Sequence, residues 1–273
     1  MSKTASCTLA VDVGNTHTVV GLFKGEKVVD HWRLTTRNET TSDEVLNRVA
    51  GLLRFSKVKQ KDITHIGLST VVPSHERPWI KALEFLIPIP VQVVTDKNCL
   101  GLKIAYPNPE AAGADRLCNI LALRERGLKD AIVVDMGTAT TFDVMKEGGF
   151  VGGLIIPGIS ASLDALTEKT AKLVPVTIEW PKKIVADNPD DAIRAGLLFG
   201  FCAELETLIK KIKKEMHWKE VPVFATGGWG KTIAKRTPCI DTYDPYLTLE
   251  GIRHVAERGT DASFYEEEEE DEV

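Results

Sequence analysis

Cysteine is scarce in this chain, and no two cysteines stand close together. An odd, scattered set argues against both a disulfide framework and a zinc site, so we expect free thiols, mostly in the core. The six histidines likewise have no metal-ligand spacing, and no Ser/His/Asp hydrolase motif is present. The five cysteines among the 273 residues are Cys7, Cys99, Cys118, Cys202 and Cys239.

Long apolar runs and basic stripes are also lacking. No apolar segment approaches the roughly 18 residues that span a membrane, and the first residues lack the basic and apolar parts of an export signal. We therefore expect a cytoplasmic protein with no membrane partner. Without a basic stripe interleaved with aromatic residues, nucleic-acid binding has no support either.

The net charge of −5 originates in one acidic run near the end of the sequence. Residues 266–272 contribute −7, so the remaining residues together carry +2. Such a run cannot bury apolar surface. We therefore expect residues 259–273 to form a disordered acidic tail.

The first half of the sequence predicts an α/β unit. A buried strand ends in a tight Gly-Asn-Thr turn, and its hairpin partner follows directly. A segment with helical spacing then begins behind a Ser42-Asp43 start signal. The predicted order is three strands, a helix, a strand, a second helix and a strand. The strands are residues 7–13, 18–23, 27–34, 63–72 and 91–95, and the first helix is 42–55.

The second half predicts the same opening. The segment Asp12-Val13-Gly14-Asn15-Thr16 recurs about 123 positions later as Asp135-Met136-Gly137-Thr138-Ala139, again between a strand and its partner. This repeat indicates two similar α/β lobes with a cleft between them. The predicted elements are strands within 131–145 and at 150–158, helices at 160–170 and 190–216, and a closing strand at 221–228.

The repeated turns suit nucleotide phosphates. Glycine lets backbone N–H groups approach phosphate oxygens closely, hydroxyl and amide groups donate further hydrogen bonds, and a carboxylate can hold a hydrated Mg²⁺. A competing phosphate site is the segment 225–232 (ATGGWGKT), which matches a relaxed P-loop pattern. Too few residues follow it for the further strands of a P-loop fold, so Lys231 is expected to lie on the surface.

The segment Gly113-Ala114-Asp115-Arg116 places an acid beside a base where a helix is expected to begin. Asp115 could accept a proton from an attacking hydroxyl, and Arg116 could pair with a substrate carboxylate. A helix N-cap with a surface salt bridge is an equally compatible interpretation. Further on, the helix predicted at 160–170 could point its N-terminus, with Ser160 and Ser162, at an anion.

The chain resembles the type III pantothenate kinases over nearly its whole length, from about residue 9 to 258. The matching stretches are DVGNT, WRLTT, STVVP, YPNPEAAGADR, DMGTATTFD, GGLIIPG, TGG and DPYLTLEGIRHV. The resemblance implies an actin-like fold of two duplicated ribonuclease H-like lobes, 1–119 and 120–258, with a nucleotide cleft between them. It also implies ATP-dependent phosphorylation of pantothenate, Mg²⁺, a monovalent cation such as K⁺ or NH₄⁺, and a homodimer.

The resemblance further implies a role for individual residues. Asp115 would be the general base, Asp135 would bind the monovalent cation, and Asp12 would hold Mg²⁺ through water. Pantothenate would contact Tyr106, Gly113, Ala114, Asp115, Arg116 and the position of Pro189. ATP would contact Asp12, Val13, Gly14, Asn15, Thr16, His17, Thr18, Val19 and Thr138.

Pro189 departs from the family pattern, because it stands where the family usually has a threonine that binds pantothenate from the neighbouring subunit. Proline offers neither a hydroxyl nor an N–H group. Two alternative functions therefore stay open beside pantothenate kinase: a catalytically silent nucleotide-binding regulatory relative, and a kinase for another small hydroxyl substrate.

Overall fold

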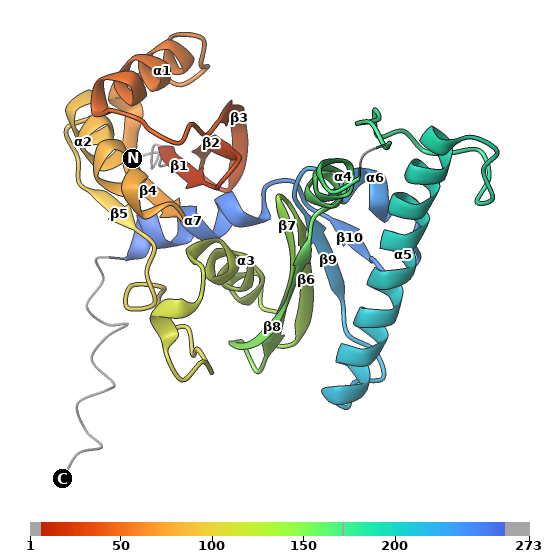
Figure 1. The fold of residues 1–273 in the computed structure, drawn as a ribbon. Helices are drawn as coiled ribbons and strands as arrows, with labels where there is room; N and C mark the ends of the chain where they lie inside the picture. The colour runs from red at the N-terminus through yellow and green to blue at the C-terminus, as the bar shows by residue number, and fades with distance from the viewer. Residues whose placement is uncertain (1–6, 171, 260–273) are drawn as a thin grey trace. The chain divides into compact units, whose positions relative to one another are not determined.

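A computed structural model describes residues 7–170 and 172–259 (Figure 1). Among these residues, contacts divide the chain into two compact units: unit 1 comprises 7–129, 145–152 and 246–259, and unit 2 comprises 130–144, 153–170 and 172–245. The lobe boundaries of 1–119 and 120–258 stay a prediction. The expected acidic tail, apart from residue 259, lies outside the described residues.

Unit 1 contains a five-stranded sheet in the order β3-β2-β1-β4-β5. Strands β1, β2 and β3 are joined by hairpins and pair antiparallel, whereas β4 runs parallel to β1 and β5 runs parallel to β4. The strands are β1 (Cys7–Val13), β2 (His17–Lys24), β3 (Lys27–Thr35), β4 (Ile63–Thr70) and β5 (Val91–Val93). All five strands predicted from the first half of the sequence are therefore confirmed.

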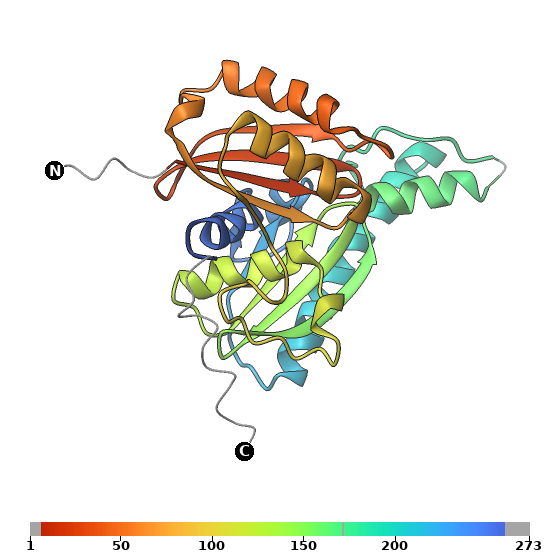
Figure 2. The same ribbon diagram turned by 90° about the vertical axis from the view of Figure 1, so that its left-hand side faces the viewer.

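Helices cover both faces of this sheet (Figure 2). Helices α1 (Ser42–Arg54) and α2 (Pro73–Leu86) pack on one face, where Leu9 and Val11 of β1 join one apolar core. Helices α3 (Ala114–Glu125) and α7 (Leu247–Arg258) pack on the other, where Ala10 joins a second core. Alternate residues of β1 thus serve opposite faces, as the two-residue period of a strand requires.

The start of α1 differs slightly from the prediction. Its N-cap is Thr41, whose side chain accepts a hydrogen bond from the backbone N–H of Glu44 while the Glu44 carboxylate accepts from the N–H of Thr41. This reciprocal capping box satisfies two backbone donors of the first turn. The residue that caps the helix is therefore Thr41, one position before the predicted start signal at Ser42-Asp43.

Glycines allow α7 to approach the sheet and α3 very closely. A Cβ atom built on Gly67 of β4 would lie 2.6 Å from a methyl carbon of Ile252, and one built on Gly21 of β2 would lie 2.6 Å from a methyl carbon of Leu249. Within the helix, Gly251 lies against the backbone of Cys118 in α3. Close packing of this kind tolerates no added methyl group without a shift of the neighbours.

Unit 2 contains most of a second five-stranded sheet, in the order β10-β9-β6-β7-β8. From β8 inward, the order of third, second, first, fourth and fifth strand repeats that of the first sheet, which confirms the duplication. The prediction that residues 221–228 close the series was wrong, because the short strand β10 follows them. The strands are β6 (Ala131–Met136), β7 (Ala139–Lys146), β8 (Gly149–Pro157), β9 (Val223–Thr226) and β10 (Thr242–Tyr243).

The remaining elements of unit 2 are helical. They are α4 (Ile159–Glu168), α5 (Pro189–Glu215) and α6 (Gly230–Ala234), and unit 1 adds the 3₁₀ turns η1 (Gln60–Asp62) and η2 (Pro109–Ala111). The five cysteines, which all lie among the described residues, form no disulfide bond, and four of them are buried. Among the described residues, no helix is both long and apolar enough to cross a membrane.

Candidate active site

The turn between β1 and β2 is tight and polar. The backbone N–H of Gly14 donates to the carbonyl of His17 at 3.1 Å, and Asn15 and Thr16 form an exposed tip. The N–H of Thr36 donates to the carbonyl of Thr16 at 2.9 Å, which ties the tip to the end of β3. The hydroxyl groups of Thr18 and Thr36 also share a hydrogen bond of 2.9 Å. The residues predicted to bind ATP phosphates, 12–19, are thus consecutive positions of one anchored hairpin.

Two partly buried carboxylates, Asp12 and Asp115, interact electrostatically in unit 1. Asp12 at the end of β1 pairs in register with Ser69 of β4, whose hydroxyl donates to Oδ1 of Asp12 at 3.1 Å. Burial and then the negative charge of Asp115 raise the pKa of Asp12 to about 7, although the Ser69 hydrogen bond opposes the shift. The structure therefore brings together Asp12 and Asp115, which lie 103 positions apart in the sequence.

Asp115 lies in the first turn of α3. The N-cap of this helix is Gly113, so the interpretation of Asp115 as an N-cap was wrong. Its Oδ1 instead accepts a hydrogen bond from the backbone N–H of Arg116 at 2.8 Å. A Cβ atom on Gly113 would lie 2.6 Å from the same oxygen, so any other residue at 113 would force this carboxylate to move. Burial raises the pKa of Asp115, and the N–H and charge of Arg116 oppose the rise.

Arg116 is buried, not exposed as a surface salt bridge would require. Its side chain is only 6% exposed, and Nη1 donates to the hydroxyl of Tyr106 at 3.1 Å. The guanidinium carbon lies 5.1 Å from the ring centre of Phe150, which sequence reasoning did not identify. Ala114 begins the same helix and is partly buried. The predicted substrate residues 106 and 113–116 therefore form one cluster in unit 1.

The second turn lies in unit 2, between β6 and β7. The N–H of Gly137 donates to the carbonyl of Ala139 at 3.0 Å, so Thr138 forms an exposed tip. Gly158, the N-cap of α4, donates its N–H to the carbonyl of Thr138 at 3.1 Å. Gly227 has a φ of +82°, and a Cβ atom there would lie 2.5 Å from Oδ1 of Asp135. Asp135, Thr138 and the start of α4 are therefore close neighbours, as is the Thr-Gly-Gly segment after β9.

Pro189 occupies the first position of α5. The side chain of Asn188 caps this helix by accepting from the backbone N–H of Asp191 at 2.9 Å. Pro189 also borders a hollow of about 330 Å³ whose lining is almost entirely apolar: Leu166, Leu173, Ala192, Ile193, Gly196 and Leu197. Within unit 2, the proline thus starts a helix beside apolar side chains.

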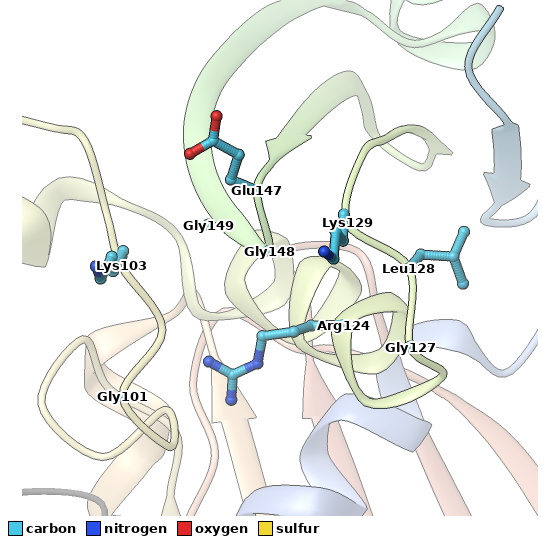
Figure 3. A pocket seen from close by; sticks show the side chains of 9 residues that line it. All are labelled: Gly101, Lys103, Arg124, Gly127, Leu128, Lys129, Glu147, Gly148 and Gly149. Atoms are coloured by element: carbon cyan, nitrogen blue, oxygen red, sulfur yellow. The ribbon is translucent and has the colours of Figure 1, made fainter.

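Another hollow, of about 390 Å³, lies in unit 1 and is lined by none of the predicted site residues (Figure 3). Its charged side chains are Lys103, Arg124, Lys129 and Glu147, and glycines and Leu128 complete it. The carboxylates with raised pKa values lie elsewhere. We therefore place the candidate site at Asp12, Asp115 and Arg116. Two carboxylates with raised pKa values and a buried guanidinium meet there, at the start of α3.

Two further expectations concern metals and the P-loop. Among residues 7–170 and 172–259, no group of three or more His, Cys, Asp or Glu side chains is arranged to hold a metal ion. Lys231 is exposed on the five-residue helix α6, as expected for a surface lysine. Ser160 of α4 accepts a hydrogen bond from the indole of Trp229 at 3.4 Å.

Comparison with solved structures supports the fold. A ROK hexokinase from Thermus thermophilus is 15% identical and matches with a TM-score of 0.52, covering 92% of this chain and 98% of the hexokinase. A Baf-family protein from Campylobacter jejuni is 17% identical with a TM-score of 0.56, covering 91% and 97%. Identities this low show the fold alone. With the duplicated sheets, they give this chain an actin-like α/β fold.

Sequence comparison is more specific. The type III pantothenate kinase family model matches residues 8–211. Type III pantothenate kinases from Acidothermus cellulolyticus and Dictyoglomus turgidum are 37% and 38% identical, covering 92% and 90% of this chain and 98% and 97% of the relatives. The chain belongs to the type III pantothenate kinase family.

Proposed function

We propose that this protein transfers the γ-phosphoryl group of ATP to the primary hydroxyl of pantothenate, the first step of coenzyme A biosynthesis. The observation that carries the proposal is the cluster of Asp115, Arg116 and Asp12 in a chain of this family. A partly buried carboxylate beside a buried guanidinium offers a base for the hydroxyl and a partner for the carboxylate of the same substrate.

Asp115 acts as the general base. Burial raises its pKa from the ordinary value, which makes the carboxylate a stronger base than a solvated one. It accepts the hydroxyl proton as the new bond forms between the substrate oxygen and the γ-phosphorus. The bond to the leaving ADP oxygen breaks in the same displacement. Most of the acceleration comes from positioning and electrostatics, as in other phosphoryl transfers.

Arg116 binds the carboxylate of pantothenate. Its planar fork can donate two parallel hydrogen bonds to a carboxylate, and the contact with Tyr106 fixes its direction. Gly113 and Ala114 line the approach at the start of α3, where the helix dipole also favours an anion. This arrangement favours an acidic acceptor over a neutral sugar.

The hairpin at residues 12–19 binds the phosphates of ATP, and Thr138 is also assigned to ATP binding. Asp12 would hold Mg²⁺ through water, and its raised pKa fits a carboxylate whose charge a cation balances. When bound, Mg²⁺ neutralises charge on the phosphates. Asp135 would bind K⁺ or NH₄⁺, because a carboxylate oxygen can coordinate K⁺ and can accept a hydrogen bond from NH₄⁺.

A homodimer in the cytoplasm, with Pro189 near the pantothenate of the partner subunit, completes the proposal. The test is a coupled assay of ADP release with and without pantothenate and with K⁺ or Na⁺. We expect turnover that depends on pantothenate and is higher with K⁺. Turnover only with another hydroxyl compound would identify a different kinase, and nucleotide binding without turnover would identify a regulatory relative.

The assay of an Asp115→Asn variant tests the base. We expect kcat to fall by about two to four orders of magnitude while ATP binding persists. Asp43→Asn is the matched control, because Asp43 is also acidic, lies in the first turn of α1 and is exposed. If Asp115→Asn retained turnover within about threefold of wild type, Asp115 would not be the base.

A further inference from the structure

Phe150 lies at the centre of the cluster that contains Arg116 and Tyr106. It is fully buried at the start of β8. The guanidinium of Arg116 lies over its ring at 5.1 Å from the centre, and the ring of Tyr106 meets it edge-on at 5.2 Å and 61°. Arg116 in turn donates to the hydroxyl of Tyr106. One aromatic ring therefore touches both side chains that are proposed to receive the substrate.

Backbone pairing fixes Phe150 and Tyr106 to each other. Ile104 forms an isolated parallel bridge with Phe150. The N–H of Ala105 donates to the carbonyl of Phe150 at 2.9 Å, and the N–H of Phe150 donates to the carbonyl of Lys103 at 2.8 Å. These bonds place the backbone just before Tyr106 in a defined register with β8.

Gly152 packs beside the ring of Tyr106. Its φ of +124° is one that side chains with a Cβ atom rarely adopt, and a Cβ atom there would lie 3.4 Å from Cε1 of Tyr106. The backbone conformation, more than the space beside the tyrosine ring, therefore favours glycine at this position.

The ring has a specific effect on the arginine. The face of an aromatic ring attracts a cation electrostatically, and the attraction strengthens where water is excluded. Arg116 is almost fully buried, so its guanidinium is held by the Phe150 face and the Tyr106 hydroxyl before any substrate arrives. A guanidinium group that is already ordered loses less conformational freedom when it binds a carboxylate.

We propose that Phe150 is a positioning residue for recognition of the acceptor's carboxylate: its ring face orients the Arg116 fork, and its edge contact orients Tyr106. This inference rests on the proposed function, since it assumes that Arg116 binds the pantothenate carboxylate. Phe150 itself does not touch the reacting atoms. Its loss should therefore raise KM for the acidic acceptor and change kcat and KM for ATP little.

The test replaces Phe150 by phenylalanines with one, two and three ring fluorines, which keep the shape and reduce the negative charge of the ring face. We expect KM for pantothenate to rise stepwise with fluorination, by about three- to tenfold at the end of the series. KM for the analogue whose carboxylate is reduced to an alcohol should not change. Trifluorophenylalanine at Phe201, a buried position in α5, is the control.

Phe150→Leu extends the test, because it keeps an apolar side chain but removes the ring, and it should exceed the effect of three fluorines. Suppose that the wild-type protein phosphorylates pantothenate but KM for pantothenate stays the same across the fluorinated variants. This result overturns the role of Phe150 and leaves the proposed function standing. Equal losses for pantothenate and its neutral analogue also overturn that role, since they indicate a purely structural residue. A wild-type protein that neither binds nor phosphorylates pantothenate overturns the proposed function and this role with it.

Discussion

The hydroxyl of Ser69 donates a hydrogen bond of 3.1 Å to the carboxylate of Asp12, from a position that is completely buried. The two residues pair in register on the parallel strands β1 and β4. Burial and the charge of Asp115 favour the protonated form of Asp12, whereas the Ser69 hydroxyl favours the ionised form. Ser69 therefore helps to keep Asp12 available as a carboxylate near neutral pH.

Ser69→Ala should raise the pKa of Asp12 further, because it removes the hydrogen bond that stabilises the charged form. At pH 7 we expect KM for Mg·ATP to rise about two- to tenfold, with a smaller change in kcat. The loss should diminish as the pH rises toward 9 and Asp12 ionises. Steady-state kinetics at several Mg²⁺ concentrations measure this. Thr64→Ala, on the same strand with its hydroxyl bonded to the carbonyl of Cys7, is the control. An unchanged KM for Mg·ATP would contradict the role of Ser69.

Gly251→Ala should destabilise unit 1. A Cβ atom at Gly251 would lie 2.1 Å from the carbonyl oxygen of Cys118, so α7 and α3 must separate. Forced overpacking of this kind typically costs about 1–3 kcal/mol. Urea unfolding followed by circular dichroism measures the loss. Gly51→Ala is the control, since that helical glycine has no atom within 4 Å of an added Cβ, and the change should stabilise α1 slightly.

Much of the fold could be predicted because the signals are local. The apolar run at 7–13, the glycine turn and its hairpin partner are neighbours in sequence, and their repetition at 131–145 indicated the second sheet. The position of α7 could not be predicted, because Gly67 and Ile252 meet across 185 positions of sequence. The strand β10 has only two residues, which is too short to show the alternation of apolar and polar side chains that identifies a strand.

The candidate site could be predicted only in part, because its residues come from distant parts of the sequence. Asp12 and Asp115 were identified from their turns, but their mutual effect on pKa depends on how α3 packs on the sheet. Ser69 gave one available signal, a polar residue ending an apolar strand parallel to β1. Phe150 gave another, a large aromatic residue among the glycines 148, 149, 152 and 153. Neither signal specifies a partner.

Glu250→Gln should reduce stability near neutral pH and lose its effect in acid. Burial alone would raise the pKa of Glu250, but Arg126 and His254 outweigh it and bring the pKa to about 2, below the ordinary 4.5. Nε of Arg126 donates to the carboxylate at 2.9 Å and joins α3 to α7. Because the folded pKa is depressed, the stabilisation is present above pH 4.5 and is lost as the pH falls toward 2.

We expect Glu250→Gln to cost about 1–3 kcal/mol at pH 7. Denaturant unfolding at intervals from pH 7 to pH 3 measures the difference from wild type, which should shrink below pH 4.5. The exposed Glu204 of α5 provides the control variant Glu204→Gln. A difference that stays constant across this range would mean that the ion pair does not determine the loss.

Pro189→Thr tests whether the departure at this position weakens pantothenate binding. The resemblance places a threonine hydroxyl here that contacts pantothenate from the neighbouring subunit, and one neutral hydrogen bond is worth about two- to tenfold in affinity. We therefore expect Pro189→Thr to lower KM for pantothenate by that factor with little change in kcat. The Asn188 cap remains, so the start of α5 should persist, although loss of the proline at the first helical position should lower the melting temperature slightly. Pro189→Ala is the matched control, because it removes the ring without adding a hydroxyl and should not lower KM. If Pro189→Thr and Pro189→Ala have the same effect on KM, or if the threonine raises it, the proline serves to begin α5 beside its apolar hollow and takes no part in binding the substrate.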